Sequence, residues 1–213
     1  MGRVVQLLFF WLVVRPVVLV VLGLNVRHRE RLPARGPAIV VANHNSHLDT
    51  VVLMTLLPSR LLPRIRPVAA ADYFLRNALI AWFARRIMGI IPIERRGREP
   101  GADPLAPVSE ALGRDEIVIL FPEGTRGEPE RLATFKSGVA HLAKRHAQVP
   151  VIPVFMHGLG KTLPRGSLVP VPFFCDVFVG DALYGREDYK AFLGDLTARM
   201  QELAGEGRFP AWE

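Results

Sequence analysis

Several short stretches of this chain are apolar at every position, and they constrain its fold more than any other feature. They are Ala38–Ala42, Ile117–Leu120 and Val149–Met156. Short continuous apolar runs that are rich in valine and isoleucine are typical of strands covered on both faces. Such strands occur mostly in parallel sheets whose two faces are packed by helices. The sequence therefore predicts an α/β fold with a buried central sheet.

Segments with helical apolar spacing alternate with these runs. We expect strands at 38–42, 67–71, 90–93, 116–121 and 149–156 with one or two more in 169–179, and helices at 46–57, 73–88, 104–112, 135–146 and 187–204. This order predicts a mixed, largely parallel central sheet flanked by helices. The polar motifs fall mainly where strands end, which is where α/β proteins usually build their sites.

The start of the chain has a different pattern. Residues 4–24 are apolar except for Gln6, Arg15 and Gly23, which is long enough for a helix to span a bilayer. Arg15 and Pro16 interrupt the middle, where a charge is costly in hydrocarbon and a proline breaks the hydrogen-bond ladder of a helix. Arginines flank the segment on both sides, at positions 3, 27, 29, 31 and 35.

This pattern favours a helix, or a broken pair of helices, lying among the headgroups of a membrane. A single membrane span, a buried core helix and a cleaved signal peptide are the alternatives, although no clear small-x-small cleavage site follows. We expect residues 1–31 to form an N-terminal membrane-associating helical segment and residues 32–213 to form one globular domain. The protein would then act at the cytoplasmic face of the cell membrane, either monotopic or with a single span.

The composition narrows the choice of partners. The net charge is +7 and the pI is near 10.3, so the chain can attract nucleic acid, anionic lipid or phosphate-bearing substrates. No reading helix or aromatic-rich basic patch of a nucleic-acid module is visible, so we expect no nucleic-acid partner. Cys175 is the only cysteine, which excludes an intrachain disulfide, and its apolar neighbours predict a core position.

Chemistry is suggested first by His44, which follows the strand at 38–42 and precedes Asp49 by five positions. A histidine accepts a proton well near neutral pH, and a carboxylate that holds one ring nitrogen fixes its tautomer. Both residues lie at one strand-to-helix junction, where their side chains can meet. The same spacing also occurs around structural histidines, so this motif alone is weak evidence for a catalytic histidine.

Three further blocks follow in order: Gly89–Arg95 (GIIPIER), Phe121–Arg126 (FPEGTR) and Val149–Val154 (VPVIPV). Together with the His44–Asp49 motif they resemble the glycerolipid acyltransferase family, which comprises the 1-acylglycerol-3-phosphate acyltransferases and related lysophospholipid acyltransferases. The resemblance extends from about Asn25 to Val179. It implies that residues 32–213 are an acyltransferase domain.

The resemblance also implies roles for individual residues. His44 would be the general base and Asp49 its orienting partner. The implied substrate-binding residues are Arg95, Glu123, Gly124, Thr125, Arg126 and Lys136.

The chemistry of these residue types agrees with the implied roles. An arginine offers a fork of donors that suits a phosphate, so Arg95 and Arg126 would hold a phosphomonoester. Arg96 and Arg98 follow closely and leave the choice of arginine open. Lys136 could add charge beside a helix N-terminus, or it could be a surface lysine.

The expected function is transfer of a fatty acyl group from acyl-carrier protein or coenzyme A to the hydroxyl of a lysophospholipid. 1-Acyl-sn-glycerol-3-phosphate, which gives phosphatidic acid, is the favoured acceptor. Lyso-ornithine lipid or another lysophospholipid is the main alternative. A lipid esterase using Ser46 is disfavoured because the chain has no G-x-S-x-G elbow, and a non-catalytic membrane-binding module is also open.

No metal or redox cofactor is expected. His44 and His47 have a spacing found among metal ligands, but no further cluster of cysteine, aspartate or glutamate stands out in the sequence. The expected partners are therefore the lipid bilayer, the lysophospholipid and the acyl thioester of acyl-carrier protein or coenzyme A.

Overall fold

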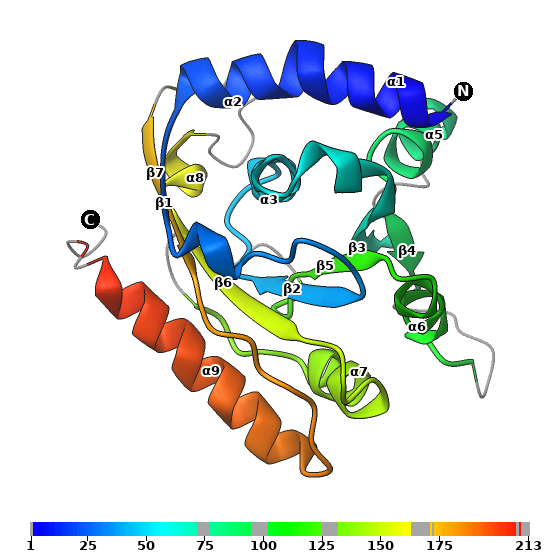
Figure 1. Cartoon of the computed structure of the whole chain (residues 1–213), viewed down its shortest axis with the longest axis vertical. Coiled ribbons are helices and arrows are strands. Elements are labelled where there is room, and N and C mark those ends of the chain that lie inside the picture. The colour runs from blue at the N-terminus through cyan, green and yellow to red at the C-terminus, as the bar shows by residue number, and fades with distance from the viewer. Residues whose placement is uncertain are drawn as a thin grey trace.

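The computed structural model describes residues 2–71, 77–94, 102–124, 132–162, 171, 173–207 and 209. These residues form one seven-stranded sheet with helices on both faces (Figure 1). The strands are β1 (Leu22–Arg27), β2 (Ala38–Ala42), β3 (Ile65–Ala70), β4 (Ile91–Ile93), β5 (Ile117–Leu120), β6 (Val151–His157) and β7 (Phe173–Val179).

The strand order is β1-β7-β6-β2-β5-β3-β4. All neighbouring strands are parallel except β6 and β7, which are antiparallel. The expected mixed, largely parallel sheet is therefore confirmed. β2 lies in the middle of the sheet and is buried at all five positions, which explains why none of its residues is polar.

Helices cover the two faces of the sheet. They are α1 (Gly2–Phe9), α2 (Arg15–Val21), α3 (Leu48–Leu56), α5 (Ala78–Arg86), α6 (Ala106–Gly113), α7 (Gly138–Arg145), α8 (Leu159–Thr162) and α9 (Tyr189–Glu206), with a π-helical turn at Phe10–Val14 and short 3₁₀ helices at Arg29–Arg31 and Ser59–Arg64. One core lies between the sheet and α1, α2 and α3, and a second lies between the sheet and α6, α7 and α9 (Figure 1). Cys175 is buried in the first core, as expected.

The N-terminal segment is helical from Gly2 to Val21 and runs along one side of the molecule (Figure 1). Its middle turn, Phe10–Val14, is π-helical, and the amide of Arg15 donates to the carbonyl of Phe10. Because Pro16 has no N–H to donate, this wider turn lets the helix continue past it. Of the described helices, none combines the length and the apolar character that crossing a bilayer requires.

The last part of this segment differs from the expectation. Residues up to 31 were expected to be helical, but Leu22–Arg27 form the edge strand β1, paired in parallel with β7. Leu22, Leu24 and Val26 alternate with less apolar residues, a strand period concealed by the apolar run before it. A Cβ at Gly23 would lie 2.6 Å from the ring of Phe174, so the glycine leaves room for this ring in its present position.

Candidate active site

The site lies at the edge of the sheet where the parallel strands end. β2 and β5 are neighbours with Val41 opposite Leu120, so the loops that follow them emerge side by side. The first loop carries His44 and the second carries Phe121 and Glu123. Two motifs separated by more than seventy residues in the sequence are therefore brought together by strand pairing.

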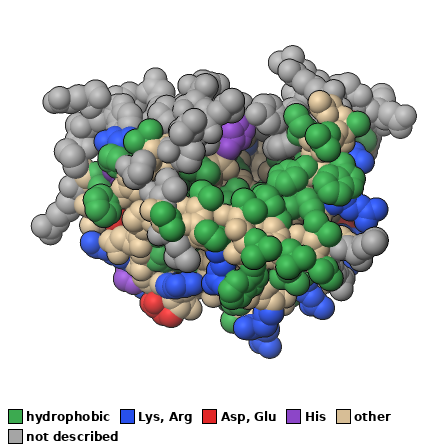
Figure 2. Space-filling view, turned by 90° about the horizontal axis from the view of Figure 1, so that it is seen from above, with side chains coloured by type: hydrophobic (Ala, Val, Ile, Leu, Met, Phe, Trp, Pro, Cys, Tyr) green, Lys and Arg blue, Asp and Glu red, His purple; other side chains and the backbone are tan. Residues whose placement is uncertain are grey.

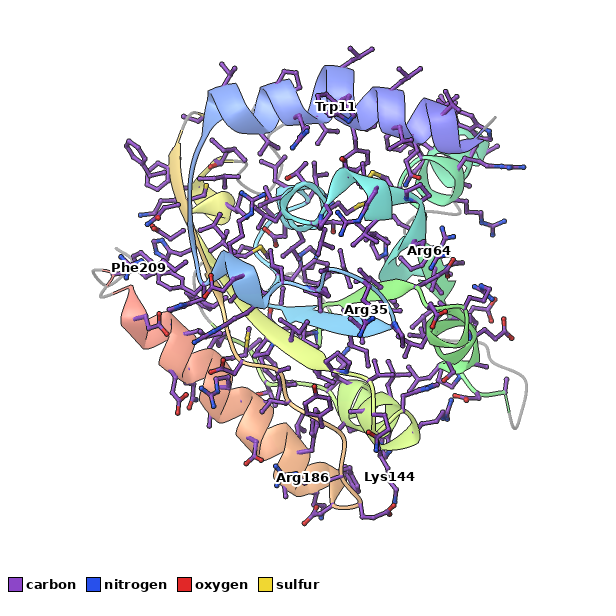
Figure 3. All side chains as sticks on the ribbon, in the orientation of Figure 1. Trp11, Arg35, Arg64, Lys144, Arg186 and Phe209 are labelled. Atoms are coloured by element: carbon purple, nitrogen blue, oxygen red, sulfur yellow. The ribbon has the colours of Figure 1, made fainter. Side chains whose placement is uncertain are left out.

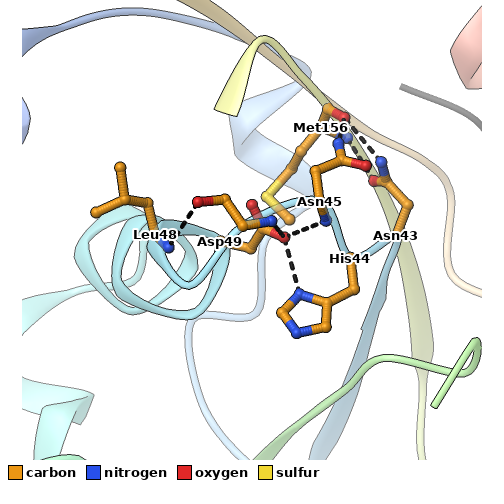
Figure 4. A network of polar contacts seen from close by, with 7 residues as sticks. Asn43, His44, Asn45, Leu48, Asp49 and Met156 are labelled. Atoms are coloured by element: carbon orange, nitrogen blue, oxygen red, sulfur yellow. Dashed lines mark hydrogen bonds and ion pairs between the residues drawn. The ribbon is translucent and has the colours of Figure 1, made fainter. Parts of the chain in front are cut away.

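His44 and Asp49 are in direct contact (Figure 4). Nδ1 of His44 lies 2.9 Å from Oδ2 of Asp49, which also accepts hydrogen bonds from the amides of Asn45 and Ser46 at 2.6 and 2.8 Å. Asp49 is fully buried, and burial raises the pKa of its carboxyl, while the bonds to His44, Ser46 and Asn45 oppose the rise. The imidazole keeps 18% of its surface exposed, so it can reach a substrate.

Two asparagines anchor the same loop to β6. The side-chain amide of Asn43 donates to the carbonyl of Met156 at 2.8 Å, and its oxygen accepts from the amide of Met156 at 2.7 Å. Asn45 donates to the same carbonyl at 3.0 Å (Figure 4). The partner of Asn43 is thus 113 residues away in the sequence. The hydroxyl of Ser46 makes a local contact, accepting from the amide of Leu48 at 3.3 Å.

Phe121 was missed as a functional residue by sequence reasoning. Its ring stacks on the imidazole of His44 with a centroid distance of 4.2 Å and an interplanar angle of 25°. Asp49 holds one edge of the imidazole while Phe121 covers one face. In the sequence, Phe121 is only the first residue of the FPEGTR motif. The residues around it do not indicate that its ring contacts a side chain in another loop.

Glu123 is buried, with 5% of its surface exposed, although it is a carboxylic acid. Within the described part of the chain, neither of its oxygens has a hydrogen-bond partner. Burial raises its pKa from 4.5 to about 7, against the opposing effects of the amide and charge of His44 and of the amide of Ala133. Neither amide meets the distance and angle of a hydrogen bond. A buried acid without a partner is rare in proteins and is typical of functional sites.

Gly124 and Lys136 form one local unit. Gly124 has φ +75°, and a Cβ there would lie 2.5 Å from Nζ of Lys136. The positive φ favours glycine, and the missing Cβ leaves room for the lysine side chain in its present position. The amide of Lys136 donates to the carbonyl of Pro122 at 2.9 Å, which ties the lysine backbone to the loop after β5.

A cavity of about 500 Å³ lies beside this unit. Its walls are mainly aliphatic and come from the ends of β3 and β4, from the loop after β5 and from the start of α7. Phe121, Gly124 and Lys136 line it. The cavity therefore adjoins the ring that packs against His44.

Three of the predicted substrate-binding residues, Arg95, Thr125 and Arg126, lie outside the described residues. Their phosphate-binding role stays a prediction, as does the choice between Arg95 and its neighbours Arg96 and Arg98. Of the predicted set, the structure brings together His44, Asp49, Glu123, Gly124 and Lys136 at one edge of the sheet.

His47 is exposed at the start of α3. Among the residues that the structure describes, no three side chains of histidine, cysteine, aspartate or glutamate are grouped so that they could hold a metal ion. Ser46 is almost fully buried, in contrast to the exposed serine of a hydrolase elbow.

Two relatives with similar sequences are 1-acyl-sn-glycerol-3-phosphate acyltransferases. A chloroplastic 1-acyl-sn-glycerol-3-phosphate acyltransferase, LPAT1 of Arabidopsis thaliana, is 34% identical over 145 residues, covering 68% of this chain and 38% of the relative. The human 1-acyl-sn-glycerol-3-phosphate acyltransferase alpha is 33% identical over 135 residues, or 62% of this chain and 44% of that protein. The chain thus spans about two fifths of the length of these relatives.

The fold has a close counterpart among solved structures. The 1-acyl-sn-glycerophosphate (LPA) acyltransferase PlsC from Thermotoga maritima superposes with a TM-score of 0.76, covering 98% of this chain and 82% of that one at 19% identity. At this identity the likeness shows a shared fold. The sequence model of the family described as Acyltransferase matches residues 23–157, more than half of the chain. With that match, the shared fold and the paired histidine and aspartate inside the matched region, this chain belongs to the acyltransferase family.

Proposed function

We propose that this protein is a membrane-associated acyltransferase that moves a fatty acyl group from acyl-carrier protein or coenzyme A to the hydroxyl of a lysophospholipid. The favoured acceptor is 1-acyl-sn-glycerol-3-phosphate, which would give phosphatidic acid. The observation that carries the proposal is the 2.9 Å contact between His44 and Asp49 inside the region that matches the family. The names of the relatives support the choice of acceptor.

The contact suggests how the reaction would run. Because Nδ1 of His44 donates to Asp49, Nε2 is left to accept the proton of the acceptor hydroxyl. The oxygen then bonds to the thioester carbon, and the carbon–sulfur bond breaks as the tetrahedral intermediate collapses. The departing thiolate takes the proton back from His44. Asp49 stabilises the imidazolium in between, and the scheme requires no covalent enzyme intermediate, metal or redox cofactor.

The second loop supplies groups suited to the acceptor. Lys136 lines the cavity beside the start of α7, where Ser137 makes no side-chain cap, so positive charge and uncapped amides lie together. Such a pairing favours an anion, and the predicted arginines Arg95 and Arg126 would add to it. The protonated form of Glu123 could donate to an oxygen of the glycerol, since burial favours that form near neutral pH.

A position on the membrane agrees with the N-terminal segment. Its inward stripe of Gln6, Phe10, Val14, Val18 and Leu22 is buried. The opposite side is also apolar and includes exposed Val5, Leu8 and Leu12. A helix that is apolar on both sides needs an apolar environment on both sides. We propose that lipid on the cytoplasmic face of the cell membrane covers the outer side, so the acceptor and product keep their tails in the bilayer.

An acyl-transfer assay tests the proposal. Labelled acyl-carrier protein and acyl-coenzyme A are offered with lysophosphatidic acid, other lysophospholipids and lyso-ornithine lipid, beside the variants His44→Ala and Asp49→Asn. We expect transfer to lysophosphatidic acid that falls about 10²–10⁴-fold in His44→Ala, while the variant remains folded. Release of free fatty acid that does not depend on an acceptor, or full activity of both variants, would refute the proposal.

A further inference from the structure

Figure 2 shows the face of the molecule that carries the N-terminal helical segment, with hydrophobic side chains gathered in a broad band and basic side chains at its margin. Part of this apolar surface belongs to another element, helix α5 (Ala78–Arg86). The sequence predicted a helix there but assigned it no function. Its exposure calls for a separate explanation.

Helix α5 lies against the start of the N-terminal segment. The ring of Phe83 makes an edge-to-face contact with Phe9 at a centroid distance of 5.3 Å. A Cβ on Gly2 would lie 4.0 Å from the side chain of Arg86. The inner side of α5 is buried through Ala84, and Ile87 just after the helix is buried as well. The two helical segments therefore present neighbouring outer surfaces.

The outer side of α5 is apolar and exposed. Leu79, Ile80 and Trp82 expose 73%, 49% and 53% of their surfaces. Two exposed arginines, Arg85 and Arg86, follow in the last turn, and residues 77–88 contain no acidic side chain. Leucine, isoleucine and tryptophan beside arginine is a combination typical of helices that rest in the headgroup region of a bilayer.

We propose that α5 is a second membrane-contacting element, which places Leu79, Ile80 and Trp82 in the same lipid surface that covers the outer side of the N-terminal segment. Arg85 and Arg86 contact anionic headgroups at the edge of this contact. A lipid partner is favoured over a protein partner because the surface is continuous with the apolar N-terminal face and the charged side chains of residues 77–88 are all arginines. With the N-terminal segment and α5 both in contact with lipid, the two contacts fix the tilt of the protein on the membrane as well as its depth in the bilayer.

This inference rests on the membrane association within the proposed function, but not on acyl transfer. The direct test uses the three tryptophans, Trp11, Trp82 and Trp212. The variant Trp11→Phe/Trp212→Phe keeps Trp82 as the only fluorophore, and Trp82→Phe/Trp212→Phe keeps Trp11. Each is mixed with vesicles of phosphatidylcholine and phosphatidylglycerol whose acyl chains are brominated, because bromine quenches tryptophan only at close range.

We expect quenching and a blue shift of Trp82 as well as of Trp11. Quenching of Trp11 with unchanged emission of Trp82 would overturn the inference, because α5 would then stay in water. A lipid-free dimer that shields Trp82, detected by light scattering and a blue shift without vesicles, would also overturn it in favour of a protein partner. Circular dichroism of each variant checks folding.

Vesicle flotation supplies a second measurement. We expect Leu79→Ser/Trp82→Ser to weaken partitioning about tenfold, and Arg85→Gln/Arg86→Gln to weaken it about fivefold per arginine on anionic vesicles only. The control is Tyr184→Ser, because Tyr184 exposes 55% of its surface, much like Trp82. It precedes Arg186, which Figure 3 shows at the opposite end of the molecule from Trp11.

An equal loss in the control and in the α5 variants, or no loss in either, would refute the role of α5. Flotation contains no acyl donor, so its result is independent of catalysis. A protein that binds vesicles through α5 but transfers no acyl group would refute the proposed reaction and leave this inference standing.

Discussion

The loops after β2 and β5 meet at the same edge of the sheet, and the two buried carboxyl groups there differ in their hydrogen bonding. One oxygen of Asp49, in the first turn of α3, accepts three hydrogen bonds from the loop that joins β2 to this helix. In the loop after β5, Glu123 is nearly as buried and has no hydrogen-bond partner among the described residues. The first carboxyl has its geometry set before substrate arrives, whereas the second has hydrogen-bonding capacity left for a substrate. Positioning and recognition are thus divided between two loops.

The largest effect is expected from breaking the first loop. Asp49→Ala removes the acceptor of two buried amides and the partner of His44. We expect the free energy of unfolding to fall by about 2–5 kcal/mol, because buried donors are left unpaired, and kcat to fall about 10²–10⁴-fold. Urea unfolding and the transfer assay measure the two effects. An Asp49→Ala protein as stable as the wild type would contradict this account of the loop.

The second loop should respond to pH in the opposite sense from an ordinary ion-paired acid. The pKa of Glu123 is raised from 4.5 in the unfolded chain to about 7 in the fold. Between these values the folded state holds a proton that the unfolded state has lost, so the contribution of Glu123 to stability is greatest below pH 4.5 and falls as pH rises through 7. The full shift sets an upper limit of about 3 kcal/mol on this contribution.

Glu123→Gln sharpens this test, because the amide cannot ionise. We expect the difference in unfolding free energy between wild type and variant to change with pH between 5 and 7.5, in favour of the variant at the higher pH. Denaturant titrations at a series of pH values measure it. A difference independent of pH would mean that Glu123 does not titrate in this range.

Gly124→Ala tests the link between the second loop and Lys136. The new Cβ would meet Nζ of Lys136 at 2.5 Å in a backbone with φ +75°. We expect a loss of about 1–3 kcal/mol of stability and a raised KM for the acceptor, because the lysine must move. The matched control is Gly113→Ala at the end of α6, where nothing lies within 4 Å of the added Cβ. That change should leave KM unaltered.

The smallest effect is expected where the two loops touch. Phe121→Leu removes the ring that stacks on His44, an interaction of about 0.5–1.5 kcal/mol. We expect kcat to fall about tenfold or less with little change in KM, because the ring only orients the imidazole. Phe209→Leu, which removes a stacking partner of His157, is the control. Equal losses in both variants would indicate a general effect on folding.

Much of this organisation could be predicted without coordinates. The fully apolar runs identified the central strands, and the expected helices and strands from 38 to 157 are present, most with ends within three residues of the expected ones. The His44–Asp49 spacing predicted a contact that the structure contains. β1 was missed because its alternating pattern follows an apolar helix without a break. The division of the chain at residue 31 stays a prediction.

Residue order along the chain already established the fold class, the paired histidine and aspartate, and the family resemblance, because all three depend on local spacing and hydrophobic pattern. Only the tertiary structure revealed three further features: the stacking of Phe121 on His44, the hydrogen bonds of Asn43 to Met156, and the exposed outer side of α5. Each depends on which strands or helices become neighbours, and strand pairing joins residues that lie 77 to 113 positions apart. Contacts at that separation leave no periodic signal in a single sequence.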